Sequence, residues 1–303
     1  MLDIPVLLIV IVLVALVFDF TNGAHDCANA IATVVSTKVL SPRTAVTMAA
    51  VLNLVGALLG SEVASTLGKG IVNTDVVMGS TILVLAALVG AIFWNILTWY
   101  YGLPSSSSHA LIGGLIGAAV THAGFASLNV ASIFKKIILP MLLSPLAGFV
   151  VSYLVMTALM LLFSSTNRRT VTKGFKKLQI LSAAFMATSH GLNDAQKTMG
   201  VITLALVLFN QIDTFYVPFW VKISCALAMA LGTALGGWKI IKTMGHRIFK
   251  LEPVHGFAAE TSASLVITGA SLIGAPISTT HTITACIFGV GSTKRLSAVR
   301  WEL

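Results

Sequence analysis

Charged side chains are scarce in this sequence. Only 10% of its 303 residues are Asp, Glu, Lys or Arg, whereas 56% are hydrophobic, and the mean hydropathy is +0.94. A soluble domain of this length carries about a quarter charged residues. Residues 4–18, 76–101 and 137–163 contain no charged residue, and a helix that crosses a bilayer needs about 20 apolar residues. So many such runs exclude a soluble protein and predict an all-α polytopic membrane protein.

The sequence shows neither a cysteine pattern typical of a metal site nor the features of a secretory signal peptide. The three cysteines, Cys27, Cys225 and Cys286, lie in apolar stretches without metal-ligand spacing. The first apolar run follows Met1-Leu2-Asp3, has no basic segment before it and no small-residue cleavage site after it. A signal peptide would have both. We therefore expect this run to stay as a helix. Separately, we expect the protein to carry no cofactor.

The few charges are mostly basic, with a formal net charge of +9. They concentrate in the connections, and residues 164–177 hold five Lys or Arg residues and no acid. Cytoplasmic loops of membrane proteins carry such an excess. We therefore interpret residues 164–177 as a basic cytoplasmic linker. We expect membrane lipid around the protein and no nucleic-acid partner.

Three motifs occur twice in the same order, about 170 residues apart. Gly23-Ala24-His25-Asp26 pairs with Gly191-Leu192-Asn193-Asp194, the Gly56/Gly60 pair matches Gly232/Gly236, and the Ser-rich run 104–109 matches the Thr-rich run 276–281. Three collinear matches predict a duplicated unit. We therefore divide the chain into a first transmembrane repeat, 1–163, the linker, 164–177, and a second repeat, 178–303.

The charges of equivalent connections predict that the two repeats are inverted. The connection at 68–75 carries one Lys and one Asp, whereas its counterpart at 239–250 carries four Lys or Arg residues. Loops that differ in this way face opposite sides of a membrane, as in transporters with inverted-topology repeats. With the linker inside, the N-terminus should lie outside. The first repeat continues into a long apolar helix after its Ser-rich run, so symmetry predicts one more helix beyond Leu303.

Long helices are predicted at 4–20, 44–67, 76–101, 137–163, 217–243 and 256–275. Shorter apolar pieces, which begin at polar, Gly-rich or Pro-rich breaks, are predicted at 24–38, 107–123, 179–190, 198–210 and 279–291. Broken or re-entrant helices of this kind are tolerated in a membrane only where they line a polar cavity. We expect them to meet at a site near the midplane, and we expect the Gly56/Gly60 and Gly232/Gly236 pairs to be close helix contacts.

Three acidic residues, Asp26, Asp194 and Glu260, fall inside apolar segments. A charge at that depth is costly and indicates a functional site; the alternative is a structural ion pair. Asp26 and Asp194 are related by the duplication, and each is predicted to lie at the start of a short helix. Such a pair suits a cation site.

The second recurring element is a Pro followed by hydroxyl residues and a helix. Pro104 precedes four serines and His109, and Pro276 precedes Ser278, two threonines and His281. Hydroxyl side chains cap helices, and the free N–H groups and the dipole of a helix N-terminus attract anions. Two such ends could hold one tetrahedral oxyanion, although each could also be an ordinary cap. His109 and His281 are equally open to a proton or anion contact and to a capping role.

These motifs together resemble the PiT family of inorganic phosphate transporters over essentially the whole chain. The family's Gly-Ala-Asn-Asp-Val-Ala-Asn signature is similar to residues 23–29 and, as a second copy, to residues 191–197. Its Leu-Pro-x-Ser-x-Thr-His element is similar to residues 103–109 and 275–281. The resemblance implies that Ser106 and Ser278 contact phosphate and that Asp26, Asp194 and Glu260 are essential for transport.

Two positions depart from the family pattern. Lys197 is the counterpart of Asn29, where sodium-coupled members tend to have Asn, and Asn53 stands where some relatives carry Glu. A fixed ammonium beside Asp194 would repel Na⁺ and could take its place, so we expect coupling to H⁺ or to a single Na⁺. Alternatively, Lys197 simply pairs with Asp194 and contacts the phosphate.

The sequence therefore predicts a symporter of inorganic phosphate in the cell inner membrane, working by alternating access, with a homodimer left open. Sulfate transport is the close alternative, because sulfate is also tetrahedral, and an intramembrane serine hydrolase is a remote one. The predicted phosphate contacts are Ser105, Ser106, Ser107, Ser108, Ser278, Thr279, Thr280 and Lys197. The predicted residues for the coupling cation are Asp26, Asn29, Asn193, Asp194 and Glu260, of which Asp26, Asn29 and Asp194 would bind Na⁺.

Overall fold

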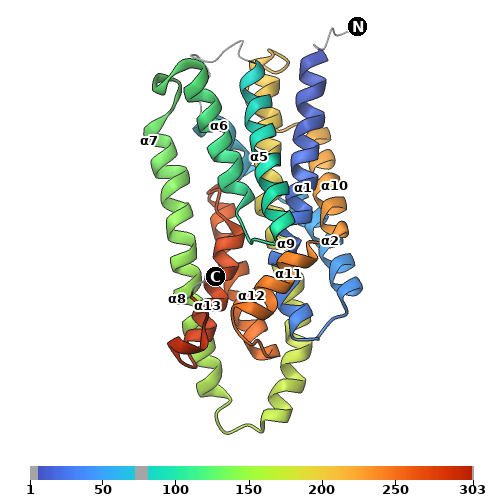
Figure 1. Ribbon diagram of the computed structural model, residues 1–303, viewed down its shortest axis with the longest axis vertical. Coiled ribbons are helices and arrows are strands. Elements are labelled where there is room, and N and C mark those ends of the chain that lie inside the picture. The colour runs from blue at the N-terminus through green and yellow to red at the C-terminus, as the bar shows by residue number, and fades with distance from the viewer. Residues whose placement is uncertain (1–5, 72–80, 302–303) are drawn as a thin grey trace.

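The structure is a computed structural model that describes residues 6–71 and 81–301. All its long elements in these ranges are helices (Figure 1). The first residues of the predicted helices 4–20 and 76–101 lie outside the described ranges. The helices of the first half are α1 (Val6–Ser36), α2 (Pro42–Leu58), α3 (Glu62–Gly70), α5 (Thr81–Tyr101), α6 (Ser107–Ala123), the short α7 (Val130–Ser132) and α8 (Leu139–Leu162). Those of the second half are α9 (Arg168–Leu208), α10 (Phe219–Leu235), α11 (Trp238–Lys242), α12 (Pro253–Leu272) and α13 (Thr279–Ser292).

The two halves have the same order of elements and run in opposite directions. A long helix, α1 or α9, is followed by a bent pair, then by α5 and α6 or by α12 and α13. In Figure 1, α1 begins at the upper end of the molecule and α9 at the lower end. The long helices pack on each other and on the bent pair of the opposite half. This arrangement confirms the predicted architecture of inverted repeats.

The prediction of breaks at 21–23 and 191–197 was wrong. Both α1 and α9 pass through these residues without interruption. The glycines there serve close packing instead. A Cβ on Gly23 would collide with the carbonyl of Met229, and a Cβ on Gly191 would collide with the carbonyl of Asn53. Asp26 and Asp194 therefore lie in the middle of long helices and not at the start of short ones.

The breaks lie instead in segments that were predicted to be continuous. The helix expected at 44–67 bends by 68° between α2 and α3, and the one expected at 217–243 bends by 62° between α10 and α11. Gly236 has a φ of +78° at the second bend, a conformation that glycine adopts without strain. The two bends occupy equivalent places in the two repeats, at Gly60 and Gly236.

Close packing at Gly56 and Gly232 is confirmed. A Cβ on Gly56 would collide with the carbonyl of Thr188 in α9, and a Cβ on Gly232 would collide with the carbonyl of Phe20 in α1. Thr188 and Phe20 are themselves equivalent under the repeat. The two crossings, α2 on α9 and α10 on α1, are therefore two copies of one contact.

The short helices α6 and α13 begin at the residues predicted from the sequence. Their N-terminal ends face each other inside the bundle, as the contact between the rings of His109 and His281 shows. The long helix α8 packs along α13 and connects the halves. The expected linker at 164–177 is mostly helical, because Asn167 caps α9 with its side chain and the basic residues from Arg168 onward form its first turns.

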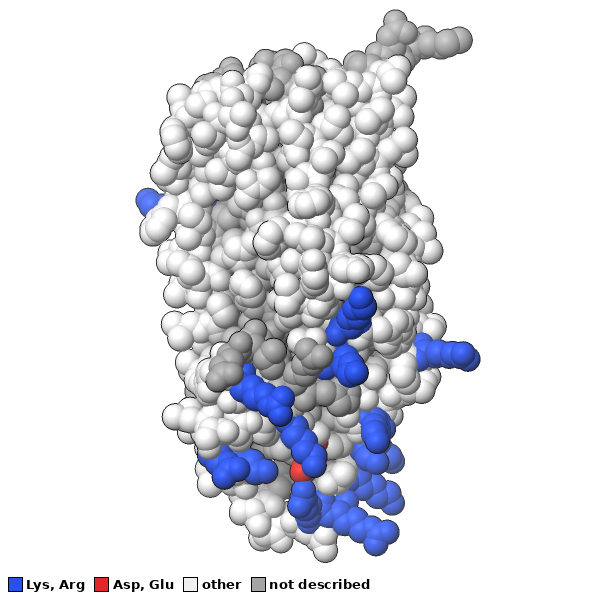
Figure 2. Space-filling view, viewed as in Figure 1, with Lys and Arg blue, Asp and Glu red and all other residues white. Residues whose placement is uncertain are grey.

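Two apolar clusters lie on either side of a polar layer. Helix α1 contributes Leu8 to Phe18 to one cluster and Cys27 to Val34 to the other. Three helices are long and apolar enough to cross a membrane, or up to five if each bent pair counts as one span. Lys and Arg gather in the lower half of the molecule, around the end where α8 turns into α9 (Figure 2).

Candidate functional site

Two polar stripes, one on α1 and one on α9, form the buried centre of the molecule. On α1 the stripe contains Asp19, Asn22, Asp26, Asn29 and Thr33, all at most 2% exposed. These residues are three or four positions apart, which places them on one face of a helix. The stripe on α9 contains Gln179, Ser182, His190, Asn193, Asp194 and Lys197, likewise buried.

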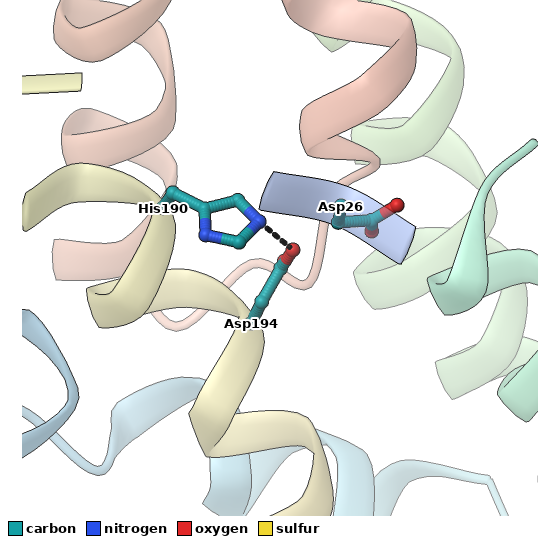
Figure 3. A group of neighbouring side chains, drawn as sticks. All are labelled: Asp26, His190 and Asp194. Atoms are coloured by element: carbon teal, nitrogen blue, oxygen red, sulfur yellow. Dashed lines mark ion pairs between the residues drawn. The ribbon is translucent and has the colours of Figure 1, made fainter. Parts of the chain in front are cut away.

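The two duplicated aspartates meet where the stripes cross. Ligand atoms of Asp26, His190 and Asp194 lie within 4.8 Å of one another (Figure 3). His190 Nε2 is 3.0 Å from Asp194 Oδ2, and His25 Nδ1 is 2.7 Å from Asp26 Oδ1. Carboxylate oxygens are good ligands for a hard cation. This cluster can therefore hold a cation between the two repeats.

In the second repeat, the position equivalent to Asn29 of α1 is Lys197 of α9. Its ammonium is paired with Asp194 and donates to Ser108 Oγ at 2.5 Å and to the carbonyl of Ile277 at 2.8 Å. A buried ammonium needs such oxygens, because they replace the water it has lost. A carboxylate, a hydroxyl and a carbonyl are also ligands that a metal cation would use.

The equivalent place in the first repeat holds an amide. Asn29 Nδ2 donates to Thr280 Oγ1 at 2.9 Å and to Thr279 Oγ1 at 3.3 Å. Thr280 and Ser108 are equivalent under the repeat, as are Asn29 and Lys197. Each long helix therefore contacts the short helix of the other half. The geometry is duplicated, but the charge is present in one copy only.

The ends of α6 and α13 present the hydroxyl residues. Ser106 and Ser278 are the N-caps, and they accept from the backbone N–H of His109 at 3.3 Å and of His281 at 3.2 Å. Thr279 donates to Asp194 Oδ2 at 2.8 Å, whereas Ser107, its equivalent, is buried with no partner among the described residues. The anion site predicted from the sequence and the aspartate cluster are therefore neighbours.

His109 and His281 face each other at the outer edge of this site. Their ring centroids are 4.9 Å apart, and both side chains are exposed. They neither cap a helix with their rings nor reach the aspartate cluster by a hydrogen bond in the described structure. Their pairing follows from the duplication, since they hold the same position in α6 and α13.

Glu260 belongs to a separate polar cluster. Its carboxylate accepts hydrogen bonds from Thr33, Ser182 and Gln179, the last at 3.2 Å. Thr33 is seven residues beyond Asp26 on α1, a rise of about 10 Å. The structure thus does not bring Glu260 together with the two aspartates.

Two more predicted site residues, Ser105 and Asn193, make their side-chain hydrogen bonds to groups outside the aspartate cluster. Ser105 Oγ accepts from the indole N–H of Trp94 at 2.9 Å. Asn193 donates to Ser271 Oγ at 2.8 Å and approaches the carbonyl of Ala275 at 3.5 Å, which ties α9 to the turn between α12 and α13. These hydrogen bonds fix the positions of the neighbouring segments, so both residues suit a structural role beside the site.

The chain matches the signature of the phosphate transporter family over residues 22–303. It belongs to the phosphate transporter family. A probable low-affinity inorganic phosphate transporter of Bacillus subtilis is 49% identical over 98% of this chain and 89% of its own length. A protein of the same description from Rhizobium meliloti is 50% identical over 98% and 89%. A solved structure described as the sodium-dependent phosphate transporter superposes with a TM-score of 0.90 at 25% identity, covering 98% of this chain and 92% of that one.

Membership of the phosphate transporter family settles the class of protein. The resemblance seen in the duplicated motifs is confirmed, and so is the prediction that the chain is a transporter and not an enzyme. The family assignment covers both the aspartate cluster and the two short helices, because the match spans residues 22–303.

The sequence analysis did not identify all the buried polar residues around this site. His190 lies one helical turn before Asp194, and that spacing could have shown it. Asp19 could have been found as an acid within an apolar run. The partners of Glu260 come from α1 and α9, at positions far apart in sequence, and no sequence pattern indicates them.

Proposed function

We propose that the chain is a secondary active symporter that carries inorganic phosphate across the cell inner membrane by alternating access. The observation that carries this proposal is the meeting of the capped ends of α6 and α13 beside Asp26 and Asp194. The names of its relatives and of the similar solved structure support phosphate as the substrate and a cation as the driving ion.

The facing helix ends supply the positive potential for the anion. Each end directs free N–H groups and the positive pole of its dipole towards the space between the halves. The Ser107 hydroxyl has no partner among the described residues and is free to donate to an oxyanion. We assign phosphate contacts to Ser106, Ser107, Ser108, Ser278, Thr279, Thr280 and Lys197, with Ser105 behind them.

Charge balance explains why the anion needs a cation. Asp26, Asp194 and Lys197 are all buried, and with His25 and His190 neutral, the two carboxylates and one ammonium leave one net negative charge. An oxyanion that enters this site adds to that charge, and uncompensated buried charge is costly. Binding of phosphate is therefore favourable only together with a cation, which is the basis of symport.

The broken symmetry of the centre suggests how many cations are used. The ammonium of Lys197 already has the ligands that a cation would take in the second repeat. The first repeat has Asp26 and the neutral Asn29 instead, with His190 adjacent. We infer that the transporter uses H⁺ or a single Na⁺, held by Asp26, Asn29 and Asp194, with Asn193 and Glu260 as further polar groups of the cation path.

Sulfate is the alternative substrate. A carboxylate beside the anion accepts a hydrogen bond from a phosphate O–H, whereas sulfate has no proton to give near neutral pH. Asp194 lies within hydrogen-bond distance of Thr279, at the end of α13 where the anion would bind. This arrangement favours phosphate.

The distribution of basic residues supports an orientation in the membrane. The exposed side chains of Arg168, Arg169 and Lys173 stand at the turn between α8 and α9, and Lys and Arg cluster around that end (Figure 2). By the positive-inside rule this end is cytoplasmic, and the N-terminus is then outside. The long apolar surface of α8 faces membrane lipid, or the partner in a homodimer.

Uptake by the purified protein in proteoliposomes tests the proposal. Labelled phosphate and labelled sulfate are offered in parallel, with an inward Na⁺ gradient or an inward H⁺ gradient imposed separately. We expect accumulation of phosphate that depends on one of the two gradients, and weak competition by sulfate. Strict dependence on Na⁺ with no response to a pH gradient would refute H⁺ coupling, and preferential uptake of sulfate would refute the substrate.

A further inference from the structure

A second buried carboxylate lies on the polar stripe of α1, one step from the central site. Asp19 is 0% exposed and sits in the middle of α1. It precedes Asp26 by seven residues, so the two share a helix face about 10 Å apart. The Glu260 cluster begins at Thr33, seven residues beyond Asp26 on the same face. Asp19 therefore lies as far from Asp26 on the N-terminal side as Thr33 does on the C-terminal side.

The carboxylate of Asp19 lacks a positive partner among the described residues. Thr198 Oγ1 donates to its Oδ1 at 2.9 Å, the one hydrogen bond that this carboxylate makes within the described ranges. Its Oδ2 is buried and has no hydrogen-bond partner in those same ranges. The charged and titratable groups that face it from neighbouring helices are Asp194 and Lys197 of α9 and the Cys225 thiol of α10. Lys197 is already paired with Asp194.

A second acceptor on the same face is also unpartnered. Asn22 is 2% exposed, and its Oδ1 is buried without a hydrogen-bond donor among the described residues. It follows Asp19 by one helical turn, so the two side chains are neighbours. Two buried oxygens without donors are unfavourable. A positive species between them, either a proton on the carboxyl group or a Na⁺ ion, satisfies both.

We propose that Asp19, Asn22 and Thr198 form a cation site that receives the coupling ion before it reaches Asp26. The inference rests on the proposed symport. The site lies between the end where α1 begins and the central cluster, and its ligands are two unpartnered oxygens and one hydroxyl. Cations would then move along α1 in steps of two helical turns.

The test compares three proteins in proteoliposomes: the wild type, Asp19→Asn, and a control, Asp213→Asn, which removes an exposed acid in the loop before α10. Phosphate uptake is titrated with Na⁺ at fixed pH and with pH at fixed Na⁺, and these two arms identify the ion. For Asp19→Asn we expect the cation concentration at half-maximal uptake to rise about tenfold, which corresponds to about 1.4 kcal/mol. The KM for phosphate at saturating cation and the uptake by Asp213→Asn should not change.

Unchanged cation dependence in Asp19→Asn overturns the proposal. A rise in the phosphate KM at saturating cation also overturns it, because Asp19 would then act in the anion site. If Asp19→Asn does not fold, Asn22→Ala, which removes the second unpartnered oxygen, is measured in the same way, with the same result expected. Absence of phosphate uptake by the wild type would instead refute the proposed function.

Discussion

The ammonium of Lys197, in the second repeat, donates a hydrogen bond to the hydroxyl of Ser108, in the first repeat, at 2.5 Å. The repeat-related contact, from Asn29 to Thr280, has the same geometry at 2.9 Å but carries no charge. A duplicated scaffold has thus kept two equivalent contacts between its halves and placed a fixed positive charge in one of them. This asymmetry leads to the first prediction.

Lys197→Asn makes the two halves alike and should create a second cation site. The Asp194 carboxylate, the Ser108 hydroxyl and the Ile277 carbonyl lose their ammonium and are left for a mobile cation. We expect uptake to become more steeply dependent on cation concentration, with one more cation carried per phosphate. The stoichiometry is measured as the size of the cation gradient that just prevents net phosphate flux against a set phosphate gradient. Lys173→Asn, at an exposed position, should leave the stoichiometry unchanged. An unaltered stoichiometry in Lys197→Asn would show that the ammonium does not substitute for an ion.

Ser107 and Thr279 are equivalent positions that should respond differently to loss of the hydroxyl. Ser107 Oγ has no partner among the described residues, so Ser107→Ala should leave folding unaffected. It should weaken phosphate binding by about 1.5 to 3 kcal/mol, the range for hydrogen bonds to charged groups. Thr279→Val removes a donor from the buried Asp194 carboxylate and should lower the free energy of unfolding by about 1 to 3 kcal/mol. Calorimetric phosphate titration and thermal unfolding measure the two effects, and equal loss of stability in both variants would contradict this assignment.

The glycines at the helix crossings should be intolerant of a methyl group to a similar degree. Gly56→Ala and Gly232→Ala each place a Cβ against a backbone carbonyl of the opposite half, and overpacking of this kind costs about 1 to 3 kcal/mol. The control is Gly174→Ala, where a Cβ meets nothing within 4 Å and alanine should stabilise the helix by up to about 1 kcal/mol. Thermal unfolding in detergent measures all three. Unchanged melting temperatures for both crossing variants would mean that the helices are farther apart than described.

Glu260→Gln should be damaging although it preserves the shape of the side chain. Thr33, Gln179 and Ser182 all donate to the carboxylate, and an amide places its own N–H group against one of these donors. A buried donor left without an acceptor costs about 1 to 3 kcal/mol. We expect a lower melting temperature and reduced uptake, whereas the exposed Asp213→Asn should show neither. Wild-type stability of Glu260→Gln would contradict this account of the cluster.

The local chemistry of the short helices was readable from sequence, and the path of the long helices was not. Ser106 and Ser278 each lie two residues after a proline and begin a hydroxyl run that leads into an apolar segment, so the start of α6 and α13 is encoded within a few residues. At Gly23 and Gly191 the same residue type signals either a break or a close contact. The neighbouring helix decides between these, and the residues that it brings against Gly23 and Gly191 are more than 130 positions away in the sequence. Thr198 could be linked to Asp19 only when α1 and α9 were placed together, because the two residues are 179 positions apart in sequence.

The most direct test of symport through this asymmetric site is gradient-driven uptake of labelled phosphate by proteoliposomes that contain the purified protein. The account predicts that phosphate accumulates above its external concentration when an inward H⁺ or Na⁺ gradient is imposed, and that accumulation ends when that gradient is collapsed. Phosphate that only equilibrates across the membrane, at a rate independent of both gradients, would contradict it.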